Sequence, residues 1–285
     1  MKILLVDVFL KGRDNCDWKD GFELYYAFKS LGYDCDIAGK NCDIPETEIP
    51  NIANNYDLII LSENYPHISG WSWYDWKSIK TPKLFWAIDT HLVDYTQFLN
   101  YNEFDYVAFN NKVDMERMVV NAKKIWLPYG ISKKHYDVNN NVSKENDIVF
   151  IGGINEDRKN YIDKYNIKTF QLYGPNYVNE MQKAKICFNK SISHDLNAKN
   201  MEIIGSGTFM LSNMNTDFLE FMDNNEYISK MFYTDDNDLE YKVNYYLNNE
   251  EEREEIAKNA RKYIFENHSY EKRMTYLIDT IKNMN

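Results

Sequence analysis

Short apolar runs alternate with longer amphipathic stretches along the first half of the chain. The short runs have the length of β-strands, and the longer stretches have helical spacing. Strands that alternate with helices are typical of βαβ units, so this half predicts a parallel sheet covered by helices. The expected strands lie near residues 2–8, 33–37, 57–61, 83–88 and 105–109, and the expected helices near 20–31 and 112–121.

The same alternation restarts after a polar segment, DVNNNVSKEN at 137–146, which has no core-forming periodicity and is interpreted as a linker. The pattern therefore predicts two α/β domains, over residues 1–143 and 144–268. In the second domain we expect strands at 147–153, 168–174 and 185–189, and helices near 155–166 and 176–183.

The last third of the chain is predominantly helical. From Glu250 to Phe265 the acidic residues come first and the basic residues later, which complements the helix dipole. Ser269 is the expected N-cap of a final amphipathic helix, whose apolar positions fall on one face. We treat residues 269–285 as a separate segment that docks on another surface.

Composition narrows the functional classes. A chain of 285 residues that is 44% hydrophobic can build two cores, and its net charge of -11 opposes binding to nucleic acid or to an anionic membrane. No uncharged apolar window approaches the roughly 20 residues of a membrane span. The four cysteines lack metal-site spacing. We expect a soluble cytoplasmic protein with free thiols.

The segment LNAKNMEIIGSGTFML, residues 196–211, contains the first candidate site. Asn197 is the expected N-cap of a short helix, Lys199 lies in its first turn, and Glu202 follows on the same face. The helix dipole disfavours a lysine at this end unless an anion binds there, so the pattern indicates a diphosphate site. An ordinary surface helix with a Lys199–Glu202 pair explains it equally well.

A second candidate is FIGGINEDRK, residues 150–159, in which a strand runs into Gly152 and Gly153 before a helix that carries Arg158. Strand, glycine turn and helix start recur at phosphate sites. The segment is neither a dinucleotide fingerprint nor a P-loop, and by itself it is better interpreted as a tight turn. Together, the two segments favour a nucleotide-diphosphate ligand.

Two weaker candidates lie in the first domain. Asp89, Thr90 and His91 follow an apolar strand, at the position where open α/β sheets bind ligands. Taken alone, these residues are better interpreted as loop residues that serve as caps. Gly12 and Arg13 could approach a ligand from the loop after the first strand.

Other polar and aromatic clusters are given structural interpretations. The acidic run at 235–238 is expected to cap a helix and not to bind a metal. The aromatic stretch at 64–76 could stack on a sugar or a base, and a core or interface role explains it as well. No serine-nucleophile or cysteine–histidine signature is present.

The order of these motifs resembles the spore-maturation CgeB-like group of glycosyltransferases. The resemblance is carried by FIGGINEDRK, LYGP, CFNKSISHDLNAKNMEIIGSG and the terminal YLNNEEEREEIAKNARKYIFENHSYEKRM. In the first domain FWAIDTHL, FDYVAFNN and IWLPYG continue it. The resemblance implies an α/β GT-B fold, in which two Rossmann-like domains with parallel sheets face a central cleft. The C-terminal helix at 269–285 would cross back to the first domain.

The resemblance also implies roles for individual residues. Glu202 would bind the donor ribose, Lys199 and Arg158 would neutralise the diphosphate, and Gly205 and Gly207 would allow close backbone approach. The implied donor site also includes Gly12, Gly152, Gly153, Tyr173, His194 and Asn197.

Two positions depart from the family pattern. The family more often has arginine at position 199, and a glutamate is expected at 194 in the related pattern of paired glutamates. Lysine offers a point charge and not a bidentate fork, so the diphosphate contact is expected to be looser. His194 is taken to approach the donor sugar or phosphate.

The expected function is that of a retaining glycosyltransferase that needs no metal or cofactor and uses a UDP-sugar, UDP-glucose or UDP-N-acetylglucosamine. The expected catalytic residues are His91, Asp89, Lys199 and Arg158, with Asp89 or His91 positioning or deprotonating the acceptor. A non-catalytic nucleotide-sugar-binding protein and an epimerase are the alternatives. The acceptor could be a protein, a cell-wall polymer, a small molecule or a modified base, and the net charge disfavours nucleic acid. The protein is expected to be a monomer or a homodimer.

Overall fold

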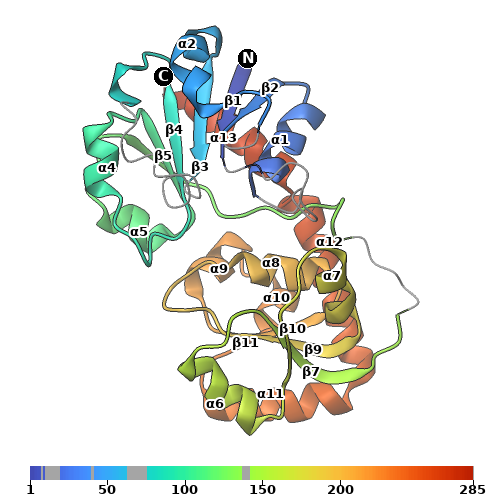
Figure 1. Ribbon diagram of the computed structural model, residues 1–285. Coiled ribbons are helices and arrows are strands. Elements are labelled where there is room, and N and C mark those ends of the chain that lie inside the picture. Colours follow the sequence, from blue (N-terminus) through green and yellow to red (C-terminus); the bar gives the residue numbers. More distant parts are fainter. Residues whose placement is uncertain (8, 10–19, 40–41, 63–75, 137–141, 285) are drawn as a thin grey trace. The chain divides into compact units, whose positions relative to one another are not determined.

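The computed structural model describes residues 1–7, 9, 20–39, 42–62, 76–136 and 142–284. It divides into two compact units, one formed by Met1–Pro128 with Tyr270–Asn285 and the other by Tyr129–Ser269 (Figure 1). Gly12, Arg13, the aromatic residues 64–75 and the centre of the expected linker lie outside the described residues.

The first unit contains a parallel six-stranded sheet in the order β2-β1-β3-β4-β5-β6. Its central strands are buried at every residue, as expected for a parallel sheet with both faces covered. The strand order reverses between β1 and β3, which creates a switch point there. The strands are β1 (Lys2–Val6), β2 (Asp34–Ala38), β3 (Leu58–Ser62), β4 (Lys83–Ala87), β5 (Tyr106–Phe109) and β6 (Lys123–Trp126).

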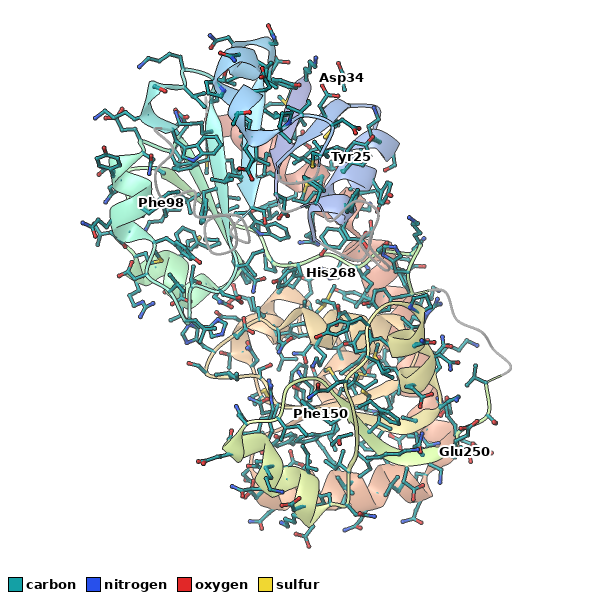
Figure 2. The ribbon with its side chains drawn as sticks, in the orientation of Figure 1. Tyr25, Asp34, Phe98, Phe150, Glu250 and His268 are labelled. Atoms are coloured by element: carbon teal, nitrogen blue, oxygen red, sulfur yellow. The ribbon has the colours of Figure 1, made fainter. Side chains whose placement is uncertain are left out.

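An aromatic cluster forms the core of this unit beside β4. The ring of Phe98, which is labelled in Figure 2, lies 5.6 Å from that of Phe85. Phe85 lies 5.7 Å from Phe104, and Phe104 contacts the fully buried Trp76. Aromatic pairs at these distances stabilise the fold beyond the contribution from burying their apolar surface. The helices are α1 (Asp20–Ser30), α2 (Ile49–Ile52), α4 (Thr96–Tyr101) and α5 (Lys112–Arg117), with 3-10 turns at Glu46–Glu48, Ala53–Asn55 and Trp76–Ser78.

The final helix, α13 (Tyr270–Met284), belongs to the first unit although the second unit precedes it in the chain. Its apolar stripe, which includes Met274, Leu277 and Ile278, is buried. The helix packs against α1 and β6 (Figure 1). The amphipathic pattern of this segment is thereby explained, because its apolar face completes the covering of the first sheet.

The second unit has a parallel five-stranded sheet in the order β11-β10-β9-β7-β8. Its strand order reverses between β7 and β9. The strands are β7 (Asn146–Ile151), β8 (Lys168–Phe170), β9 (Ala184–Asn189), β10 (Phe209–Asn213) and β11 (Phe232–Tyr233). The helices are α6 (Glu156–Lys164), α7 (Pro175–Gln182), α8 (Ala198–Gly205), α9 (Thr216–Phe221), α10 (Glu226–Lys230), α11 (Asp236–Asn248) and α12 (Glu250–Asn267).

The boundary between the units falls after Pro128, earlier than residue 143, where the polar segment suggested it. The reason is that residues between Pro128 and the polar segment, among them Ile131 and Tyr136, pack within the second unit. The N–H of Ile131 donates to the carbonyl of His268 at 3.0 Å, and the side chains of Ile131 and Tyr136 are 1% and 5% exposed. The burial of these two apolar side chains sets the boundary between the units. The polar composition of residues 137–146 does not.

The acidic run at 235–238 has the capping role that the sequence predicted. Asp235 caps α11, since its Oδ1 accepts from the N–H groups of Asn237 and Asp238 at 2.9 Å each, which supports the capping interpretation of the acidic run. Cys35, Cys42 and Cys187 are free thiols. In the described part of the chain, no helix combines the length and apolar character that crossing a membrane requires.

Removing apolar volume from α13 should destabilise the first unit. Ile278 is fully buried, so Ile278→Ala is expected to lower the free energy of unfolding by about 2–5 kcal/mol. Urea denaturation followed by circular dichroism measures this loss. Thr275→Ala, on the exposed face of the same helix, is the control and should change stability by less than about 0.5 kcal/mol. Equal effects of the two substitutions would contradict the packing of α13.

Candidate functional site

The carboxyl ends of β7 and β9 mark the switch point of the second sheet, where the two neighbouring strands continue into loops that turn apart. β7 leads into Gly152, and β9 leads into Lys190 and then into α8. Open α/β sheets bind ligands in the crevice outside such strand ends. Since α8 follows β9 and precedes the parallel strand β10, its amino terminus lies at this same edge.

Asn197 begins α8 as the sequence predicted. Its Oδ1 accepts from the N–H of Lys199 at 2.9 Å. The helix ends at Gly205, and Gly207 follows with a φ of 79°, a conformation that favours glycine. A Cβ on Gly205 would lie 2.7 Å from Ile131 Cδ1, so the close approach at this glycine is to the protein's own Ile131 and not to a ligand.

The side chain of Lys199 points back to the end of β7. Its Nζ donates to the carbonyl of Ile151 and lies 5.0 Å above the ring of Phe150, which is labelled in Figure 2. Burial lowers the pKa of Lys199, and the charge of Glu202 partly opposes that shift. Lys199 is therefore a partly buried cation at the switch point and not a solvated surface lysine.

Gly152 makes room for this cation. A Cβ at Gly152 would collide with Lys199 Nζ, and the residue has a φ of 144°, which side-chain-bearing residues rarely adopt. A Cβ on Gly153 would meet no atom within 4 Å. The two adjacent glycines of the sequence motif therefore have different roles, and the first is required by geometry.

Arg158 joins the two loops of the switch point. Its Nη1 donates to the carbonyl of Gly153 at 2.9 Å, while Nε and Nη2 donate to the carbonyl of Lys190 at 3.1 and 2.9 Å. The side chain is 9% exposed, and burial lowers its pKa. Asn155 caps α6 by accepting from the N–H of Arg158. These contacts hold the two loops together, a role that the sequence did not indicate.

Glu202 has a partner that the sequence analysis missed. The hydroxyl of Tyr177, in α7, donates to Glu202 Oε2 at 2.6 Å. Burial and the nearby Glu202 charge raise the pKa of Tyr177 well above its ordinary value, so the phenol keeps its proton and remains a donor. The two residues are 25 positions apart, and no sequence spacing signals such a pair.

His194 lies in the loop between β9 and α8. Ser193, which has a φ of 54°, contacts His194 Nδ1 through its hydroxyl at 3.0 Å. The amide of Asn215 donates to the carbonyls of His194 and Asp195 at 3.3 and 3.0 Å, which fixes the loop from the start of α9. Tyr173, beyond β8, is 81% exposed and is not held by packing.

Buried amides lie beneath this loop and also escaped the sequence analysis. Asn189 Nδ2 donates to Asn200 Oδ1 at 2.7 Å, and both residues are fully buried. Asn213 Oδ1 accepts from the N–H of Ser191 at 2.8 Å. The sequence did contain one signal of this pair, the polar Asn189 at the end of the apolar run KICFN, because a buried amide requires a hydrogen-bond partner.

Thr90 and the other polar residues after β4 belong to the first unit. Thr90 donates to Asp114 Oδ2 at 2.7 Å, both residues are buried, and Arg117 pairs with the same carboxylate at 2.9 Å. Asp89 is exposed, and its carbonyl accepts from the N–H of Leu92 at 2.8 Å. Thr90 therefore anchors the loop, and this anchor presents the neighbouring Asp89 and the partly exposed His91 beyond the strand end.

The structure thus gathers most of the expected donor-site residues in one place and leaves two expected catalytic residues in the other unit. Gly152, Gly153, Arg158, Asn197, Lys199 and Glu202 lie around the switch point of the second sheet. Asp89 and His91 follow β4 of the first sheet. Gly12 lies outside the described residues. Within the described ranges, no group of three or more His, Cys, Asp or Glu side chains is arranged to hold a metal ion.

Residues 143–279, almost all of the second unit, match a family model described as glycosyl transferase-like. No curated protein sequence matches the chain. The narrower likeness to the CgeB-like group therefore continues to depend on the sequence motifs.

Solved structures resemble the whole chain. Sucrose-phosphate synthase from Thermosynechococcus elongatus is 14% identical, with a TM-score of 0.67 and all of both chains covered. HepE from Anabaena, in complex with UDP and glucose, is 12% identical, with a TM-score of 0.67 and 99% and 100% coverage. The β-glucosyltransferase of phage T4, in complex with UDP-glucose, is 13% identical, with a TM-score of 0.64 and 99% of both chains covered. The expected GT-B fold is thereby confirmed.

A side chain at position 152 should disturb the Lys199 contact. Gly152→Ala is expected to lower stability by roughly 1–3 kcal/mol because of its backbone conformation, and further because Lys199 must move. Thermal denaturation measures the loss. Gly153→Ala is the matched control, since its Cβ would meet open space. Similar melting temperatures for the two variants would contradict the geometry described for Gly152.

Proposed function

We propose that this GT-B glycosyltransferase moves a sugar from a UDP-sugar to an acceptor hydroxyl, with UDP-glucose or UDP-N-acetylglucosamine as donor. The observation that carries the proposal is the pair Lys199 and Glu202 on α8, with Lys199 bound at the end of β7. Two relatives of the same fold were solved with UDP or UDP-glucose, which supports this donor class.

In the proposed site, Lys199 and the amino terminus of α8 bind the diphosphate. The ammonium already lies at the switch point, so its Nζ can exchange the carbonyl of Ile151 for a phosphate oxygen with little movement. The phosphate oxygen carries a negative charge and the carbonyl does not, so the ammonium gains the attraction of an ion pair in this exchange. Stabilising the charge of the departing UDP is the main catalytic contribution, and neither a metal nor a cofactor is part of the proposal.

Glu202 is proposed to bind the donor ribose. Tyr177 donates to Oε2 and leaves Oε1 to accept a hydrogen bond from a ribose hydroxyl. The Tyr177 hydroxyl also fixes the carboxylate in one orientation, which reduces the entropy lost when the donor binds.

Arg158 is proposed to act mainly as a positioning residue. Three of its N–H groups hold the backbone of Gly153 and Lys190, so it shapes the loops around the phosphates and adds positive charge beneath them. Gly153, Asn197, Tyr173 and His194 border the same site in the proposal, with His194 approaching the donor sugar.

The acceptor is proposed to be positioned by Asp89 or His91, which Thr90 anchors beyond β4. Histidine is the side chain that acts most often as a general base, so His91 is the preferred base. We propose transfer with retention of anomeric configuration, which NMR of the product tests directly.

Removing either α8 side chain should impair use of the donor. Lys199→Ala is expected to lower kcat/KM by about 100- to 1000-fold, the range seen when one stabilising contact to a developing charge is lost. Glu202→Ala should act mainly through KM, because the ribose contact is made before the reaction. UDP-glucose turnover, measured as UDP release, and UDP affinity, measured by calorimetry, separate the two effects.

Lys168→Ala is the control, since this lysine is exposed on β8. Unchanged turnover in both α8 variants would contradict the site assignment. Binding of UDP-sugars by the wild-type protein without transfer or hydrolysis would favour the non-catalytic alternative.

The lowered pKa of Lys199 predicts the pH dependence. The charged form is required, so donor turnover should fall as pH rises through that lowered pKa. Arginine stays charged at all accessible pH values, so Lys199→Arg should move the alkaline decline to higher pH. The profile of kcat/KM against pH for both proteins is the measurement. An identical alkaline decline in the two proteins would show that another group controls it.

A further inference from the structure

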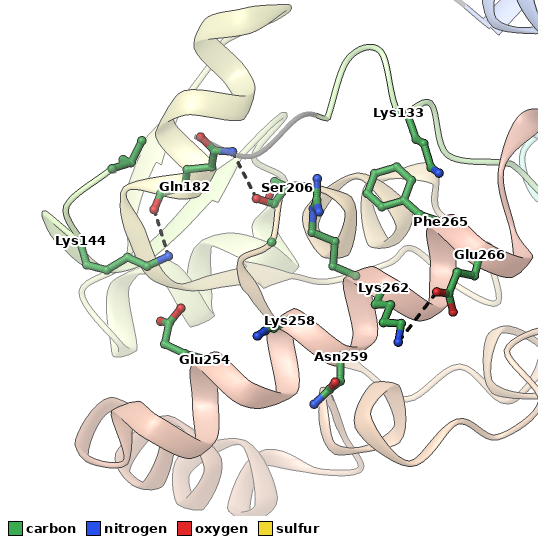
Figure 3. A pocket seen from close by; sticks show the side chains of 13 residues that line it. Lys133, Lys144, Gln182, Ser206, Glu254, Lys258, Asn259, Lys262, Phe265 and Glu266 are labelled. Carbon is green, nitrogen blue, oxygen red and sulfur yellow. Dashed lines mark hydrogen bonds and ion pairs between the residues drawn. The ribbon is translucent and has the colours of Figure 1, made fainter. Parts of the chain in front are cut away.

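A cavity lies in the second unit, against one face of α12 (Figure 3). Its volume is about 830 Å³. Its walls include Lys144 before β7, Gln182 before β9, and Ser206 and Gly207 before β10. These positions are at the amino ends of the parallel strands, whereas the candidate donor site lies at their carboxyl ends. The two sites therefore occupy opposite edges of one sheet.

The lining of this cavity is strongly cationic. Two carboxylates, those of Glu254 and Glu266, stand among five cations. This balance is notable in a chain whose net charge is -11, because the charge of the whole protein does not account for it. The five cations are Lys133, Lys144, Lys258, Arg261 and Lys262.

Two of the cations are fixed by the backbone and form the frame of the cavity. Lys144 Nζ donates to the carbonyl of Gln182 at 3.0 Å, a contact drawn in Figure 3. Arg261 Nε donates to the carbonyl of Gly205 at 2.9 Å, and its guanidinium lies 4.7 Å from the ring of Phe265. Lys144 and Arg261 therefore hold fixed positions in the wall of the cavity.

Other polar groups in the lining are available for a ligand. The side chains of Lys258 and Asn259 make no hydrogen bond or ion pair with another residue in the part of the chain that the structure describes. Lys262 makes a single exposed contact to Glu266 at 4.0 Å. One exposed face of α12 therefore presents two ammonium groups and one amide to the same space.

We propose that this cavity binds a phosphorylated sugar. Its volume lies in the range of small-molecule pockets, roughly 300–1000 Å³, and exceeds what a lone phosphate ion fills. The ammonium groups of Lys258 and Lys262 suit the phosphoryl group, and the Asn259 amide can both donate to and accept from sugar hydroxyls. Phe265 is buried and has Arg261 over its ring, so it offers no open ring face to a nucleobase.

Calorimetry on the full chain tests the proposal with three probes, namely glucose 6-phosphate, inorganic phosphate and glucose. Glucose 6-phosphate should bind at least tenfold more tightly than phosphate, and glucose should not bind measurably. The double variant Lys258→Gln/Lys262→Gln should weaken glucose 6-phosphate binding at least tenfold. Both lysines are exposed, so the variant is expected to fold normally.

Lys282→Gln is the matched control, because Lys282 is also an exposed helical lysine with an acidic neighbour, Asp279. It should bind glucose 6-phosphate as the wild type does. Neither saturating UDP nor the Lys199→Ala substitution should change the affinity for glucose 6-phosphate. The test of this cavity can therefore fail or succeed independently of the test of the donor site. Equal affinity for phosphate and glucose 6-phosphate, displacement by UDP, or full binding by the double variant would each overturn the proposal.

Discussion

The hydrogen bond from Lys199 Nζ to the carbonyl of Ile151 is the contact on which the candidate site depends. It joins the first turn of α8 to the end of β7 and so connects the two elements that flank the switch point. The contact requires a glycine at position 152, because a Cβ there would occupy the space of the ammonium group. It also requires the helix to begin at Ala198, which the Asn197 cap ensures. One polar contact thus explains two features of the sequence, Gly152 and the Asn197 cap.

The two cations of the site have different structural environments. Arg158 donates three N–H groups to backbone carbonyls, and its planar guanidinium group is suited to making several such hydrogen bonds at once. Lys199 makes a single backbone contact, which a stronger anionic acceptor can replace. Burial lowers the pKa of both side chains, but only lysine is thereby brought nearer to a pH at which it can lose its charge. Arg158 therefore supports the loops, and Lys199 is the cation that can respond to a ligand.

Helix α8 connects the two edges of the second sheet. Its amino terminus lies at the proposed donor site, and the carbonyl of Gly205 at its other end accepts from Arg261 in the wall of the cationic cavity. Ile131, from the segment that follows Pro128, packs against the same glycine. A short helix held at both ends by side-chain hydrogen bonds has little freedom to shift, so the two proposed sites share one support.

The sequence by itself determined the α/β class, eight of the eleven strands in the described part of the chain, the caps at Asn197 and Asp235, and the amphipathic last helix, because these follow from local periodicity and capping chemistry. It did not predict β6, β10 and β11. It also indicated that residues 196–211 and 150–159 belong to one site, since strand ends of a parallel sheet share an edge. Only the tertiary structure decided that Tyr177 holds Glu202, that Arg158 joins two loops, and that Ile131 moves the domain boundary to Pro128. Those contacts join residues far apart in the chain, and their partners are chosen by packing and by the need of buried polar groups for hydrogen bonds, neither of which leaves a periodic trace in the sequence.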